Sequence, residues 1–190
     1  MNERAAKAAS LLRRLTYLRI VLVPVVMWLV LDDPFTHAYG VAAALFAVAA
    51  ITDFFDGYLA RRWSATTTLG SFLDTTADKL LVSGVLIALV AAGRASAWIA
   101  AIIVGRELVI LGLRGVVAAD GDVMRPSMWG KLKANVQFVA ILLAILRTEP
   151  KLGPLYLDQF AMLAAAVVTV VSAVEYLARF SPSLSPTRRR

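Results

Sequence analysis

Four aspartates, Asp53, Asp56, Asp74 and Asp78, lie in a stretch of sequence that is otherwise apolar enough to cross a membrane. A carboxylate inside a transmembrane helix costs about 2.5–3.5 kcal/mol, so four of them would cost on the order of 10 kcal/mol without compensation. We expect the chain to place too few buried bases beside them to balance this charge. The pattern therefore predicts a bound divalent cation.

The spacing of these aspartates predicts two acidic stripes on two neighbouring helices, at about 100° of rotation per residue. One stripe consists of Asp53, Gly57 and Ala60, with Asp56 close by, and the other of Gly70, Asp74 and Asp78. Two adjacent antiparallel helices would bring the stripes face to face. The small residues would let the helices, or the phosphates of a ligand, approach closely.

Carboxylate oxygens are hard ligands that suit Mg²⁺ or Mn²⁺, and four carboxylates can hold two ions. Two such ions can clamp the attacking and leaving oxygens of a phosphoryl transfer. Intramembrane carboxylates also serve cation or proton transporters, and this alternative stays open at this point. The chain has no cysteine and a single histidine, His37, which argues against a zinc site or a histidine-based triad.

The chain has 190 residues, of which 59% are hydrophobic, more than a soluble domain of this size contains. We therefore predict an all-α integral membrane protein with one domain over residues 1–180. A basic amphipathic helix over residues 1–14 would lie in the membrane interface. Transmembrane helices are expected over residues 15–31, 39–60, 69–92, 96–118, 131–147 and 155–178.

Lysine and arginine predict the orientation of these six helices. Basic residues gather at the N-terminus, near residues 61–62, in the 120–133 region and at the C-terminus. The positive-inside rule then places both termini in the cytoplasm. The net charge of +7 is explained by anionic lipid headgroups, without nucleic acid. Residues 181–190 are predicted to form a disordered basic tail.

The acidic residues, together with their small and basic neighbours, resemble the signature of the CDP-alcohol phosphotransferase family. The matching residues are Asp53, Asp56, Gly57, Ala60, Arg61, Gly70, Asp74 and Asp78. Such enzymes join an alcohol to the phosphate of a CDP-linked lipid and release CMP. The resemblance implies that Asp53, Asp56 and Asp74 bind one metal ion, and that Asp53, Asp74 and Asp78 bind a second.

The resemblance also implies roles around the metal ions. Asp78 corresponds to the general base that takes the proton of the attacking hydroxyl. Contacts with the CDP-lipid are implied for Asp53, Gly57, Ala60, Arg61, Thr67 and Gly70. Homodimers are usual in the family, so a homodimer is expected here.

The flanking residues, including Thr16 and Arg19, resemble most closely the bacterial members that use glycerol 3-phosphate as the acceptor. This resemblance implies transfer of the phosphatidyl group of CDP-diacylglycerol to glycerol 3-phosphate, at the cytoplasmic face of the bacterial plasma membrane. A dianionic acceptor needs cations of its own. The candidates are Arg106, Arg114, Lys131 and Lys133. An alternative to glycerol 3-phosphate is another acceptor, either inositol phosphate or phosphatidylglycerol. An alternative to phosphate binding is that Glu107 pairs with a neighbouring helix while the lysines contact lipid headgroups.

Overall fold

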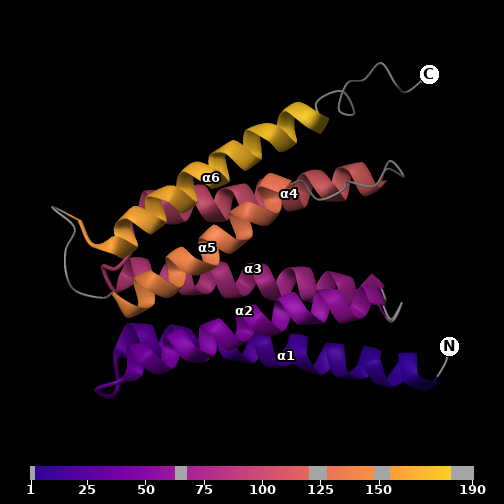
Figure 1. Cartoon of the computed structure of the whole chain (residues 1–190), viewed down its shortest axis with the longest axis horizontal. Helices are drawn as coiled ribbons and strands as arrows, with labels where there is room; N and C mark the ends of the chain where they lie inside the picture. The colour runs from indigo at the N-terminus through magenta and orange to yellow at the C-terminus, as the bar shows by residue number, and fades with distance from the viewer. Residues whose placement is uncertain (1–2, 63–67, 120–127, 148–154, 181–190) are drawn as a thin grey trace. The chain divides into compact units, whose positions relative to one another are not determined.

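The computed structural model describes the backbone of residues 3–62, 68–119, 128–147 and 155–180. Side chains are described for residues 10, 14–53, 72–118, 128–130, 132–147 and 155–179. Within these residues the chain forms six helices, and it divides into two compact units, Met1–Arg94 and Ala95–Arg190 (Figure 1). The expected single domain over residues 1–180 stays a prediction, and the tail at 181–190 lies outside the described residues.

The first unit contains α1 (Glu3–Asp32), α2 (Ala38–Arg62) and α3 (Thr68–Ala91). Helix α1 packs against both α2 and α3, so it is the element that the other two share (Figure 1). Apolar side chains from all three helices are buried between them. These include Val26, Leu29 and Val30 of α1, Ala42, Phe46 and Ala49 of α2, and Leu81, Val85, Leu86 and Leu89 of α3.

Helices α1 and α3 approach each other closely at Gly84. A Cβ atom added to Gly84 would lie 2.7 Å from Cγ1 of Val23 and 3.1 Å from the sulfur of Met27. Real Cβ atoms do not tolerate the shorter distance, so glycine is what permits this crossing. Arg19 lies one turn before Val23 on α1. The crossing therefore helps to fix the position along α3 that Arg19 contacts.

The second unit contains α4 (Ala97–Ala119), α5 (Met128–Leu146) and α6 (Leu157–Phe180). Helix α6 packs against both α4 and α5. Its apolar core includes Ile103 and Ile110 of α4, Ala140, Ile141 and Ile145 of α5, and Met162 and Ala165 of α6. Polar side chains from all three helices are buried as well, and they form a polar cluster within this unit.

The helix positions confirm the all-α prediction. For α2 to α6, both ends of each predicted span lie within three residues of the ends of the observed helix. The first helix differs from expectation. It runs without a break from Glu3 to Asp32, so the predicted interfacial segment and the first span are parts of one helix. The interfacial position of its first turns stays a prediction.

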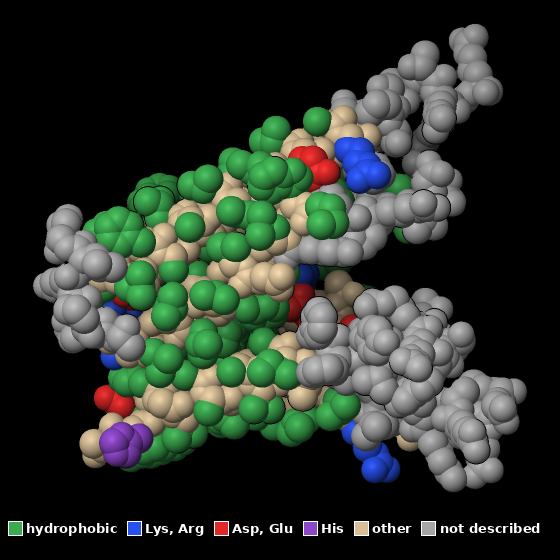
Figure 2. All heavy atoms as spheres, viewed as in Figure 1, with side chains coloured by type: hydrophobic (Ala, Val, Ile, Leu, Met, Phe, Trp, Pro, Cys, Tyr) green, Lys and Arg blue, Asp and Glu red, His purple; other side chains and the backbone are tan. Residues whose placement is uncertain are grey.

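Three described segments are long and apolar enough to cross a membrane, namely Arg14–Asp32, Met128–Leu146 and Leu157–Arg179, and Ala38–Asp53 is a shorter apolar helix. Helices α3 and α4 fall short by this measure because they carry the charged residues of the candidate site. Figure 2 shows hydrophobic side chains over the visible outer faces of the described helices. Of the apolar side chains of these helices, those of Trp28, Val48, Ile87 and Val167 are each more than half exposed. Apolar surface of this extent is typical of helices that contact lipid.

Candidate active site

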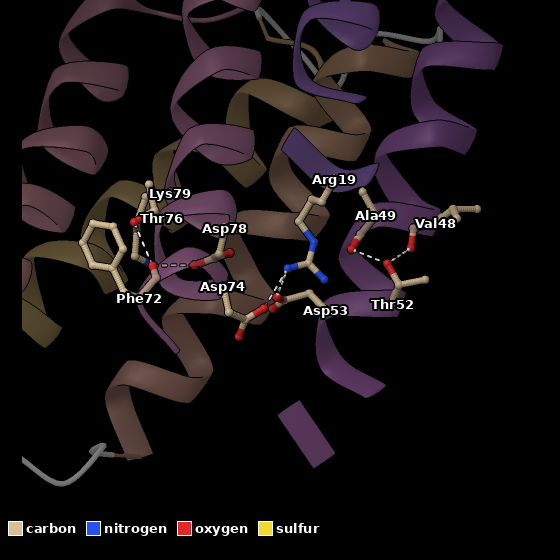
Figure 3. Close-up of polar contacts among 10 residues, drawn as sticks. All are labelled: Arg19, Val48, Ala49, Thr52, Asp53, Phe72, Asp74, Thr76, Asp78 and Lys79. Carbon is tan, nitrogen blue, oxygen red and sulfur yellow. Dashed lines mark hydrogen bonds and ion pairs between the residues drawn. The ribbon is translucent and has the colours of Figure 1, made fainter. Parts of the chain in front are cut away.

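The first part of the site lies where α1, α2 and α3 meet. Asp53 lies on α2 and Asp74 on α3, and both point to the guanidinium of Arg19 on α1 (Figure 3). The Nη1 atom of Arg19 is 2.6 Å from Oδ1 of Asp53 and 3.1 Å from Oδ1 of Asp74. The two carboxylates, which are 21 positions apart in the sequence, thus converge on a single nitrogen atom.

Arg19 is a buried base, with only 1% of its side chain exposed, whereas Asp53 and Asp74 are 26% and 39% exposed. One buried base therefore lies beside two aspartates, and its single positive charge does not balance both carboxylates, in agreement with the expectation of too few buried bases. Helix α1 supplies this cation from more than 30 residues away, a distance in sequence that the local pattern does not reveal. A buried guanidinium needs such carboxylate partners because its charge is costly to remove from water.

Asp78 lies one turn after Asp74 on α3, but its carboxylate is paired elsewhere. Its Oδ2 atom lies 2.6 Å from the ammonium nitrogen of the adjacent residue, Lys79 (Figure 3). Both side chains are about one quarter exposed. The structure therefore joins Asp53 and Asp74 through Arg19, while Asp78 makes its ion pair with Lys79.

The second unit contains a polar cluster of its own. Glu107 of α4 forms a buried ion pair with Lys133 of α5, and both side chains are at most 5% exposed. Arg106 lies 3.6 Å from the same carboxylate and donates a hydrogen bond of 2.7 Å to the hydroxyl of Ser172 on α6. One carboxylate thus faces two cations, and three helices are tied together at this level.

About two turns after Arg106 on α4, Arg114 donates a hydrogen bond of 3.0 Å to the hydroxyl of Tyr176 on α6. The guanidinium carbons of Arg106 and Arg114 lie 5.4 and 5.7 Å from the centre of the Tyr176 ring. Cation–π attraction operates at such distances. The buried Tyr176 side chain therefore holds both arginines at once.

The sequence pattern of the CDP-alcohol phosphatidyltransferases matches residues 12–171, which is most of the chain. The chain belongs to this family. It is therefore a transferase, as the resemblance of its aspartate pattern implied.

Relatives from several bacteria match over nearly the whole length. The chain is 37% identical over 182 residues to the CDP-diacylglycerol--glycerol-3-phosphate 3-phosphatidyltransferase of Bacillus subtilis, covering 90% of this chain and 94% of the relative. It is 42% identical over 178 residues to a Mycobacterium tuberculosis protein named "Probable phosphatidylglycerophosphate synthase", covering 92% and 83%. A third relative, the CDP-diacylglycerol--glycerol-3-phosphate 3-phosphatidyltransferase of Salmonella choleraesuis, is 40% identical over 168 residues, covering 86% and 90%.

CDP-alcohol phosphatidyltransferases generally use divalent metal ions. The described aspartates of this member fit such an ion, because Asp53 and Asp74 offer hard oxygen donors that already face one positively charged atom. Among the described side chains there is no group of three acidic, histidine or cysteine residues close enough to hold a metal ion. The side chain of Asp56 lies outside the described part, so the complete ligand set stays a prediction.

Apart from Asp53, the residues predicted to contact the CDP-lipid lie on segments whose side chains are not described. The backbone of Gly57, Ala60 and Arg61 belongs to α2, and that of Gly70 belongs to α3. Thr67 lies outside the described residues, as does the side chain of Lys131. Their contacts with substrate stay predictions.

Sequence reasoning missed the α6 residues that hold the arginines. Ser172 and Tyr176 are four positions apart, and Thr169, which accepts a hydrogen bond from Gln137 of α5, is three positions before Ser172. Polar residues at this spacing occupy one face of a helix. Because residues 160–174 of this helix are otherwise apolar, Thr169 and Ser172 were a readable signal for an inward-facing polar surface.

Proposed function

We propose that the chain transfers the phosphatidyl group of CDP-diacylglycerol to glycerol 3-phosphate and releases CMP. The observation that carries this proposal is the match with bacterial relatives named for this activity over 83% to 94% of their length. The two polar clusters agree with it, because one gathers acidic residues that suit divalent cations and the other gathers cations that suit an anionic acceptor.

We assign Asp53, Asp56, Asp74 and Asp78 to one or two Mg²⁺ or Mn²⁺ ions. When bound, the ions would neutralise negative charge on the diphosphate and on the reacting oxygens. Asp78 would take the proton from the attacking hydroxyl of glycerol 3-phosphate. The oxygen of that hydroxyl would then form a bond to the phosphorus that bears diacylglycerol, and the bond from this phosphorus to the oxygen of the CMP phosphate would break.

The phosphate of glycerol 3-phosphate is assigned to cations of the second unit. Arg106 and Lys133 contact Glu107, and the Tyr176 ring lies beside both Arg106 and Arg114. Glu175 is a second carboxylate that acts on Arg106. These three described cations, of which Arg114 is exposed, outnumber the two carboxylates by one. Lys131, on the same helix as Lys133, would add a further positive charge. A dianionic phosphate that reaches the exposed Arg114 would compensate this excess.

We further propose the arrangement in the membrane. Six transmembrane helices would place both termini and the active site on the cytoplasmic side of the bacterial plasma membrane, where both water-soluble reaction partners are available. Gly57, Ala60, Arg61, Thr67 and Gly70 would contact the CDP part of the lipid. The functional protein would be a homodimer.

An acceptor panel tests the proposal. Purified protein would receive labelled CDP-diacylglycerol with glycerol 3-phosphate, inositol phosphate or phosphatidylglycerol, each with Mg²⁺ or with EDTA. We expect phosphatidylglycerophosphate and CMP only with glycerol 3-phosphate and only with the metal. A lipid product from another acceptor alone would refute the acceptor assignment. Ion flux in liposomes without CMP release would refute the enzymatic proposal in favour of a transporter.

A further inference from the structure

Arg19 is the residue that joins the acidic helices in the first unit. Its side chain is 1% exposed, and one of its nitrogen atoms contacts the Oδ1 atoms of both Asp53 and Asp74 at 2.6 and 3.1 Å (Figure 3). These three residues belong to three different helices. The contact therefore compensates part of the charge of the two carboxylates and holds α2 and α3 together at this level.

The same oxygen atoms are the ones that a divalent ion would use. Mg²⁺ binds carboxylate oxygens at about 2.0–2.1 Å, whereas Nη1 of Arg19 lies roughly 0.5–1 Å further from each oxygen. An ion that bridged both Oδ1 atoms would take nearly the position of that nitrogen atom. A guanidinium and a divalent cation cannot share this position, because their charges repel and their volumes overlap.

We propose that Arg19 is a positioning residue that acts as a built-in counter-cation for the metal site. It holds Asp53 and Asp74 at one point, and binding of a divalent ion requires the guanidinium to release their Oδ1 atoms. Metal affinity is therefore lower than the carboxylates alone would give, and the bundle stays assembled at low metal concentration. This inference rests on the proposed metal site.

The test uses the full-length protein in detergent micelles with three variants. Arg19→Gln removes the charge, and Arg19→Lys keeps a charge that bridges two carboxylates less well than a guanidinium does. Arg14→Gln is the matched control, because Arg14 is an exposed residue of the same helix. Mn²⁺ binding is measured by electron paramagnetic resonance, and the thermal midpoint is measured in EDTA and in saturating Mn²⁺.

We expect Arg19→Gln to bind Mn²⁺ about tenfold more tightly than the wild type, since a competing positive charge is gone. In EDTA its thermal midpoint should fall by roughly 5 °C, and saturating Mn²⁺ should restore it to the wild-type value. The Mn²⁺ affinity of Arg19→Lys should lie between those of the wild type and Arg19→Gln, with at least a threefold gain over the wild type. Arg14→Gln should match the wild type. An arginine with only a structural role would lower the midpoint equally with and without Mn²⁺.

The outcomes separate this inference from the proposed function. If the wild type shows saturable Mn²⁺ binding but Arg19→Gln binds equally or more weakly, the inference is wrong and the proposed metal site stands. If the wild type binds no Mn²⁺, the metal site and the inference both fail. Should Arg19→Gln not fold, Arg19→Lys decides alone, and an affinity no higher than that of the wild type overturns the inference.

Discussion

The crossing of α1 and α3 at Gly84 offers a sharp test of how packing supports the active site. In Gly84→Ala the new Cβ would meet Cγ1 of Val23 at 2.7 Å, against about 3.5–4.0 Å for a relaxed carbon contact. Met27 can move its flexible end, but Val23 is β-branched, 9% exposed and has little freedom at χ1. The helices must therefore separate locally.

The expected magnitude combines two opposing effects. Overpacking of this kind costs about 1–3 kcal/mol, whereas replacing glycine by alanine inside a helix gains about 0.5–1 kcal/mol. A net loss of roughly 0.5–2 kcal/mol should lower the thermal midpoint by about 1–8 °C in a chain of this size. Because Arg19 lies one turn from Val23, phosphatidyl transfer should fall as well.

The assay is thermal unfolding of the purified protein in detergent, with transferase activity measured in parallel. Gly40→Ala in α2 is the control, since nothing lies within 4 Å of a Cβ at Gly40, and it should be neutral or slightly stabilising. The double variant Gly84→Ala with Val23→Ala should recover part of the lost stability relative to Val23→Ala alone. If Gly84→Ala unfolds at the wild-type temperature and Val23→Ala shows no coupling to it, the reasoning about this crossing is refuted.

Three further predictions concern the polar residues. Glu107→Gln should destabilise the protein strongly, by up to about 3–5 kcal/mol, because the buried Lys133 loses its carboxylate. Equilibrium unfolding of the double variant with Lys133→Gln should show much of this stability recovered. If the losses of the two single variants simply add in the double variant, the pair does not contribute as argued. Tyr176→Phe keeps the ring but removes the hydroxyl that accepts from Arg114, so the KM for glycerol 3-phosphate should rise about 2- to 10-fold with little change for CDP-diacylglycerol; steady-state kinetics with each substrate varied would expose the opposite pattern. Asp78→Asn should abolish turnover and largely preserve binding of the CDP-lipid, and substantial remaining activity would exclude Asp78 as the base.

Hydropathy and charge in the sequence were sufficient to predict the helices, whereas the roles assigned to individual site residues stay predictions. The predicted spans matched because runs of apolar residues end at Pro, Gly and charged residues, such as Asp32 before α2 and Gly93 after α3. Gly93 has a φ of +67°, and its neighbour Arg94 donates back to the carbonyl of Leu89, which is the usual way in which a glycine ends a helix.

Neighbour relations between helices could not be predicted in the same way. The period of a helix shows which face is buried, but it does not show which helix covers that face. The position of Arg19 between Asp53 and Asp74 therefore became visible only with the packing of α1 against α2 and α3. Pairing of Glu107 with a neighbouring helix was one of two alternatives, and the partner proved to be Lys133, whose burial rules out contact with lipid headgroups.

The order of helices along the chain gives the Arg19 contact a consequence for biosynthesis. Helix α1 leaves the ribosome before α2 and α3, so the guanidinium is already in the bilayer when each carboxylate arrives. Helix α2 carries Asp53, and α3 carries Asp74, Asp78 and Lys79, so both enter the lipid poorly by themselves. The Arg19 guanidinium lowers the barrier to insertion of α2 and α3 into the bilayer. Loss of Arg19 should therefore reduce the yield of inserted protein during synthesis, even where metal is plentiful.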